Sequence, residues 1–186
     1  MRWAAYATAF VVCSCAGWVG AQPSVRPASA TAIRDGRTLL DARPLGMPLN
    51  GVSAASLRDT FNEGRPGHTH EAIDILAPRG TPVYAVDDGP LVKLFTSVPG
   101  GLTVYQFDPS GQLAYYYAHL DGYAQGLKEG ATLRRGDLIG YVGSTGNASP
   151  DAPHLHFAVF RLGPEKQWWK GTPVNPFEAL RRIAPP

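Results

Sequence analysis

Residues 67–75 read Gly-His-Thr-His-Glu-Ala-Ile-Asp-Ile, and this stretch decides the fold that we expect for the chain. Side chains alternate across a β-strand, so residues two or four apart share a face. If the stretch is extended, one face carries His68, His70, Ala72 and Asp74. The two isoleucines then point to the opposite face, toward a core. The pattern predicts a strand that presents metal-capable groups on one side and apolar side chains on the other.

A second stretch, residues 153–157, repeats this pattern as Pro-His-Leu-His-Phe. His154 and His156 share one face, and the leucine and phenylalanine share the other. Buried imidazoles need polar partners, and a metal ion can supply one. Two imidazoles and one carboxylate with an open fourth position make up a catalytic zinc site. The spacing and residue types therefore favour one zinc ion bound by His70, Asp74 and His156.

All five histidines of the chain fall in three clusters, and His119 in Tyr-Ala-His-Leu forms the third. A single histidine is more often a hydrogen-bonded structural residue than a ligand, and we keep that interpretation for His68. The sequence His70-Glu71-x-x-Asp74 also comes within one residue of the helical His-Glu-x-x-His motif of zinc proteases. The isoleucines, followed by Pro78 and Gly80, favour an extended chain over that helix.

Short strand-like segments separated by turn residues predict an all-β fold, an antiparallel sandwich or barrel-like sheet. We expect these strands at residues 81–86, 91–96, 101–107, 112–120, 137–142 and 155–160. Residues 176–183 have helical character, and Asn175 is a plausible N-cap for a short C-terminal helix. The formal net charge is +2, without a basic tract, so we expect no nucleic-acid partner.

The N-terminus has the features of an export signal. Arg2 precedes an apolar run that ends in Val-Gly-Ala, so we predict a signal peptide over residues 1–21 and an exported, periplasmic or secreted protein. A transmembrane anchor is the weaker alternative. Cys15 lies in a sequence that loosely resembles a bacterial lipobox, which would make the protein a lipoprotein. Contact with a membrane is expected only through such a leader or lipid. Residues 22–45 have no clear period and are interpreted as a tether.

Five blocks in the following order resemble the lysostaphin-type (LytM-like) peptidoglycan endopeptidases. They are His-x-x-x-Asp at 70–74, Ala-Pro-x-Gly-Thr-Pro-Val at 77–83, Tyr-x-His-Leu at 117–120, Gly-x-x-Gly-Ser-Thr-Gly at 140–146 and Pro-His-Leu-His-Phe at 153–157. The likeness covers about residues 45–180. One departure is Ala72, where many relatives carry glycine.

The resemblance implies an antiparallel β fold with an open groove, formed here by residues 46–180, with residues 181–186 as a tail. It implies zinc bound by His70, Asp74 and His156, with His119 and His154 matching the two catalytic histidines. Tyr117 could stabilise an oxyanion or simply pack in a strand. The loop at 144–151 should form the rim of the groove, and Trp168 and Trp169 should pack at the domain edge rather than stack on sugars.

The implied activity is hydrolysis of the peptide cross-links of bacterial cell-wall peptidoglycan by a zinc metallopeptidase, with the peptide stems as its partner. Two alternatives belong to other classes of protein. One is a module with the same fold that binds the wall or activates another wall hydrolase without catalysis. The other is a lipoyl-type carrier, which residues 135–140 loosely resemble, although no lysine occupies a matching turn. Because relatives of the first kind have typically lost metal ligands, and this chain keeps them, we favour the enzyme. The sequence leaves the scissile bond and the oligomeric state open.

Overall fold

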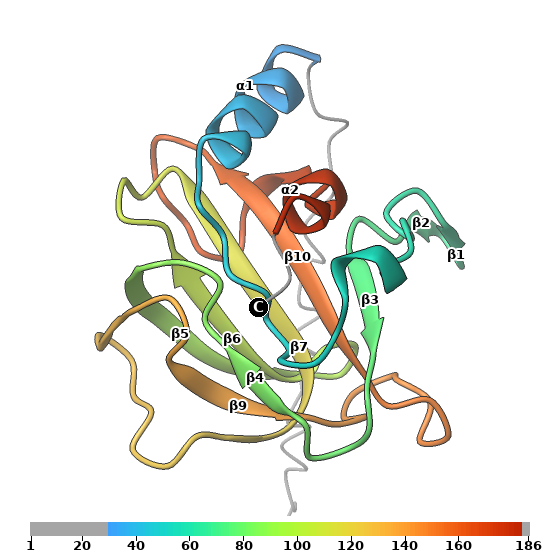
Figure 1. Cartoon of the computed structure of the whole chain (residues 1–186). Helices are drawn as coiled ribbons and strands as arrows, with labels where there is room; N and C mark the ends of the chain where they lie inside the picture. The colour runs from blue at the N-terminus through green and yellow to red at the C-terminus, as the bar shows by residue number, and fades with distance from the viewer. Residues whose placement is uncertain (1–29, 184–186) are drawn as a thin grey trace, which may run out of the picture.

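A computed structural model describes residues 30–183, and an open antiparallel β-sheet forms the body of this part of the chain (Figure 1). In chain order the elements are α1 Ala30–Asp41, the 3-10 turn η1 Ala54–Ser56, β1 Gly64–Arg65, β2 His68–Thr69, β3 Ile73–Leu76, β4 Pro82–Tyr84, β5 Gly89–Ser97, β6 Gly101–Phe107, β7 Leu113–Tyr123, β8 Thr132–Leu133, β9 Leu138–Val142, β10 His154–Leu162, β11 Gly171–Val174 and α2 Phe177–Arg181. The prediction of an all-β antiparallel fold with a short C-terminal helix is confirmed.

The large sheet has nine strands, of which six follow the order β11-β10-β7-β6-β5-β8. Strand β10 pairs with β7 along one edge. Its other edge pairs first with β3 and then with β11. In this register His156 lies opposite Asp74 on one neighbour and opposite Ala118 on the other. The sheet topology alone thus brings the segments around residues 74, 118 and 156 side by side.

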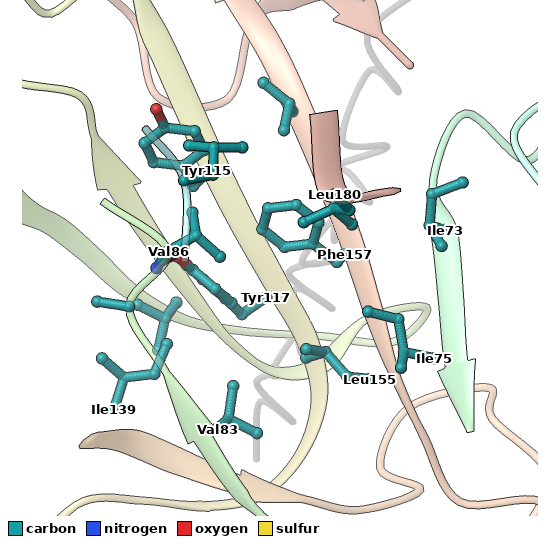
Figure 2. Close-up of a cluster of buried hydrophobic side chains, with 14 of the residues drawn as sticks. Ile73, Ile75, Val83, Val86, Tyr115, Tyr117, Ile139, Leu155, Phe157 and Leu180 are labelled. Atoms are coloured by element: carbon teal, nitrogen blue, oxygen red, sulfur yellow. Dashed lines mark hydrogen bonds between the residues drawn. The ribbon is translucent and has the colours of Figure 1, made fainter. Parts of the chain in front are cut away.

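The core lies on one face of this sheet, where side chains from β3, β4, β7, β9 and β10 meet the helix α2 (Figure 2). Along β10, Leu155, Phe157 and Val159 are fully buried, whereas His154 and His156 are only partly buried. This is the predicted alternation, and it is confirmed for β10. Burying a side chain such as Leu155 or Phe157 stabilises the fold by about 1.5–3 kcal/mol, and this burial fixes the opposite face of the strand.

Helix α1 lies within the segment that we interpreted as a tether, residues 22–45. A side chain at Gly36 would lie only 2.5 Å from a methyl group of Val174, so the helix approaches β11 closely at that point. The carboxylate of Asp41 also accepts a hydrogen bond of 2.6 Å from Arg182, just beyond α2. The helix is ordered by these tertiary contacts, which a local sequence pattern does not show.

Several expectations concern residues outside the part that the structure describes. They are the signal peptide of residues 1–21, the lipobox around Cys15, the start of the tether and the last three residues of the tail. Between residues 30 and 183, no helix is both long enough and apolar enough to cross a membrane.

Candidate metal centre and active site

The stretch of residues 67–75 is interrupted at Glu71, whose φ of 58° is left-handed. The prediction of one continuous strand over residues 68–75 is therefore wrong, and the stretch is not helical either. Around the kink, the backbone amides of His70 and Glu71 donate to the carbonyl groups of Glu63 and Phe61. The kink buries Ala72 completely, away from the side that we expected, and turns His70 and Asp74 toward one cavity.

Three atoms that can bind a metal ion lie close together where β3 pairs with β10. His70 Nε2 lies 3.0 Å from Asp74 Oδ1, and His156 Nδ1 lies 3.1 Å from both of these atoms. Ligands of a tetrahedral zinc ion lie roughly 3.3 Å from one another at ordinary bond lengths. Two imidazole nitrogens and a carboxylate oxygen in this arrangement fit zinc. The structure brings together the three residues that the sequence suggested as ligands.

Hydrogen bonds to the backbone fix the tautomers of three of the histidines. A carbonyl oxygen can only accept, so a ring nitrogen bonded to it must carry the proton. The Nδ1 atoms donate in this way in three pairs, His70 to Thr60 at 3.0 Å, His119 to Thr145 at 2.8 Å and His154 to Ala152 at 2.8 Å. In its neutral form each of these rings therefore carries the proton on Nδ1, which leaves Nε2 able to bind a metal ion or to accept a proton. His156 is turned the other way and contributes Nδ1.

The ionisation of the cluster follows from burial and from Asp74. Burial alone would raise the pKa of Asp74, but hydrogen bonds from His156 and His70 hold it well below its usual range. Burial opposes the charged form of His70, yet the bond to Asp74 leaves its pKa raised. Burial lowers the pKa of His156, and it lowers the pKa of His119 to about 4. His119 is therefore a neutral imidazole at neutral pH in this environment.

His119 enters the cavity because β7 breaks its alternation there. Its φ of 60° is left-handed, and the register between β6 and β7 shifts beside it. Tyr117, two residues earlier, is completely buried, accepts a hydrogen bond from the Val86 amide and donates one to Gln106 Oε1, each 3.0 Å long. The suggestion that Tyr117 stabilises an oxyanion is therefore wrong, and it packs in the core. Tyr116 is the tyrosine that lines the cavity.

The cavity has a volume of about 450 Å³. The described residues that line it include all five histidines, together with Arg65, Pro66, Asp74, Pro99, Gly100, Tyr116, Ala118, Asn147, Ala148 and Ser149. Residues 147–149 belong to the loop that we expected at the rim. His68 is exposed at the edge, where its Nδ1 contacts the Pro66 carbonyl at 3.1 Å. Trp168 packs against Phe95 and Tyr105, as expected of a residue at the domain edge.

Sequence reasoning missed several residues that hold the site together. The hydroxyl of Thr60 accepts a hydrogen bond from the Asp74 amide, and its carbonyl orients His70. The hydroxyl of Thr145 accepts from the Leu102 amide and donates to the Leu120 carbonyl, which fixes the loop that orients His119. The loop motif containing Thr145 was recognised, but nothing local in the sequence distinguishes Thr60.

Comparisons with known proteins show which family this chain is similar to. The protein-family model described as peptidase family M23 matches residues 68–176. The L-Ala–D-Glu endopeptidase of Bacillus subtilis is 31% identical over 150 residues, which are 76% of this chain and 44% of that protein. Glycyl-glycine endopeptidase ALE-1 of Staphylococcus capitis is 36% identical over 95 residues, 50% of this chain and 25% of that protein. This chain thus spans less than half the length of either curated relative.

A solved structure of a peptidase domain is similar to this chain in fold. The catalytic domain of the antimicrobial peptidase lysostaphin from Staphylococcus simulans superimposes with a TM-score of 0.55 and 26% sequence identity. The match covers 78% of this chain and 97% of that domain.

Proposed function

This chain belongs to peptidase family M23, and we propose that it is a zinc-dependent endopeptidase that hydrolyses peptide cross-links of bacterial peptidoglycan. One observation carries the proposal. His70 Nε2, Asp74 Oδ1 and His156 Nδ1 lie within 3.1 Å of one another in a cavity that also contains His119 and His154. A purely structural cluster has no need to place His70, His154 and His156 around a single carboxylate oxygen, Asp74 Oδ1.

The residues divide into two roles in this proposal. His70, Asp74 and His156 would hold zinc, which supplies Lewis-acid chemistry and makes water a nucleophile near neutral pH. His154 Nε2 lies 3.7 Å from Asp74 Oδ1, and its ring centroid lies 4.9 Å from that of His119. One of these two histidines accepts a proton from the attacking water at Nε2 and delivers it to the leaving amine. The other, once protonated at Nε2, hydrogen-bonds the developing negative charge on the carbonyl oxygen.

The proposed substrate and location come from the family and from the sequence. The two curated relatives are named for cleavage of an L-Ala–D-Glu bond and of a glycyl-glycine bond. Peptides of the bacterial wall contain both kinds of bond. A wall hydrolase acts outside the cytoplasm, which agrees with the export signal that residues 1–21 predict.

The purified protein tests the proposal directly. We expect about one zinc ion per chain, digestion of isolated peptidoglycan sacculi, and loss of digestion on chelation that added zinc restores. His156→Ala should lose both zinc and activity, whereas His119→Ala should keep zinc and lose activity. His68→Ala is the matched control, because His68 makes no contact with the ligands, and it should retain both properties.

The same experiment separates the enzyme from the non-catalytic alternative. A zinc-loaded protein that leaves sacculi and cross-linked peptides intact would instead support a module that binds the wall or activates another hydrolase. His156→Ala with full zinc and activity would show that the ligand assignment is wrong.

A further inference from the structure

A short two-stranded ribbon forms one wall of the cavity beside the proposed metal centre. Strands β1 and β2 pair with each other, separate from the large sheet, and project next to β3 (Figure 1). Arg65 of β1 lies opposite His68 of β2 and faces the cavity. Among the described residues that line the cavity, Arg65 is the only lysine or arginine.

Two carboxylates orient the guanidinium of Arg65, and their contacts occupy only one of its nitrogen atoms. Its Nη2 lies 3.0 Å from Asp74 Oδ2 and 3.2 Å from Glu63 Oε2. Asp74 thus turns Oδ1 toward the histidines and Oδ2 toward Arg65. Both contacts of Arg65 use Nη2, so Nη1 and Nε have no partner among residues 30–183. An arginine that is held in a fixed orientation and still has N–H groups without a partner is suited to bind a planar carboxylate.

The charges of the cavity favour an anionic ligand. Apart from the histidines, Asp74 and Arg65 are the only described lining residues with a side chain that is charged at neutral pH, and their charges cancel. A bound divalent cation would therefore leave the lining with a net positive charge. Glu63 lies outside the lining and is half exposed, so solvent screens much of its effect.

We propose that Arg65 binds a free carboxylate of the substrate peptide and thereby selects acidic stem peptides over glycine bridges. This inference rests on the proposed function, and it names the substrate class of the same site. Stem peptides contain acidic residues that retain a carboxylate after peptide-bond formation, whereas an internal glycine bridge contains none. Arg65 lines the cavity and contacts Asp74 at Oδ2, whereas His70 and His156 contact the same carboxylate at Oδ1.

Two cross-linked peptides that differ only in one group test the proposal. One carries the free stem carboxylate, and the other carries the corresponding amide, which has the same shape without the charge. The zinc-loaded wild type should prefer the carboxylate about 10- to 100-fold in kcat/KM, as expected for a charge-assisted hydrogen bond. Arg65→Ala should cleave both peptides at nearly equal rates while its zinc content stays unchanged. Arg79→Ala is the matched control, because this exposed arginine bonds Asp121 and does not line the cavity.

The outcomes separate substrate binding from mere positioning of Asp74. An equal loss on both peptides, with or without loss of zinc, would assign Arg65 to holding Asp74 and would overturn the proposal. An unchanged preference in Arg65→Ala would also overturn it.

If the wild type cleaves neither peptide, the proposed function fails, but the role of Arg65 can still be measured by calorimetry. A preference in Kd for the carboxylate peptide that disappears in Arg65→Ala would support the inference without catalysis. Equal Kd values for the two peptides in the wild type would refute it.

Discussion

Replacing Thr145 by valine removes one hydroxyl group and should weaken both the fold and the catalytic geometry. The hydroxyl accepts a 3.0 Å hydrogen bond from the Leu102 amide and donates a 2.8 Å bond to the Leu120 carbonyl. Valine keeps the shape but leaves both backbone groups without this partner in a half-buried position. At about 1–2 kcal/mol for each group, the free energy of unfolding should fall by about 2–4 kcal/mol. Thr145→Ser keeps the hydroxyl and should lose less than about 1 kcal/mol for the missing methyl.

Thr145→Val should also change the orientation of the His119 ring, because the backbone of the same loop bonds to it. The Thr145 carbonyl accepts the proton of His119 Nδ1 at 2.8 Å, so a looser loop orients that ring less well. Misplacement of a catalytic group can lower the rate by about 100-fold, and we expect Thr145→Val to lower kcat by about 10- to 100-fold. Urea unfolding, zinc analysis and cleavage of a cross-linked peptide measure the three quantities. Zinc content should not change, since Thr145 contacts none of the ligands. Equal stability and equal kcat in Thr145→Val and Thr145→Ser would refute this reasoning.

Three further predictions concern the core, a turn and the metal. Tyr117→Phe leaves the Val86 amide and Gln106 Oε1 without their buried partner, so thermal or urea unfolding should show a loss of about 2–4 kcal/mol, with zinc content unchanged. Burial would raise the pKa of Asp108, but hydrogen bonds from Ser110 and from backbone amides lower it below its usual value. Its stabilisation is therefore complete above about pH 4, the usual value for an unfolded aspartate, and is lost as the pH falls through the lowered pKa, so Asp108→Asn should show a weaker fall in stability as the pH drops below about 4. Zinc at about 100 times its Kd should stabilise the wild type by about 2.7 kcal/mol, measured as a rise in Tm that a chelator reverses and that is absent in His156→Ala.

The start of the strand at residues 154–162 could be predicted from the sequence because residues 154–157 alternate between the two faces. His154 and His156 face the cavity, and Leu155 and Phe157 face the core. The other two histidine clusters do not follow this rule, because Glu71 and His119 adopt left-handed backbone conformations. Neither residue is a glycine, so no sequence signal marks the turn. Alternation alone would place Tyr117 and His119 on the same face, although the structure separates them.

The residues that support the site were harder to predict for a different reason. Arg65 and Thr60 act on partners that are 9 to 14 positions away along the chain, and Thr145 acts on partners 25 to 43 positions away. No helical or strand period relates such positions. Helix α1 was also hard to predict, because a glycine near its middle lowers its intrinsic helix propensity. Contacts with β11 and Arg182 stabilise the helix instead.

The bond between Asp41 and Arg182 has a consequence for how this fold can be combined with other sequences. It joins the last residue of the first described helix to the residue just after α2, so the part of the fold between Asp41 and Arg182 begins and ends at one place. A domain with neighbouring ends can be inserted into a surface loop of a host protein without stretching either chain. It can also be circularly permuted by joining its ends and opening an exposed turn. The turn at Gly126 is suited to such an opening, because it is exposed and lies outside the cavity lining.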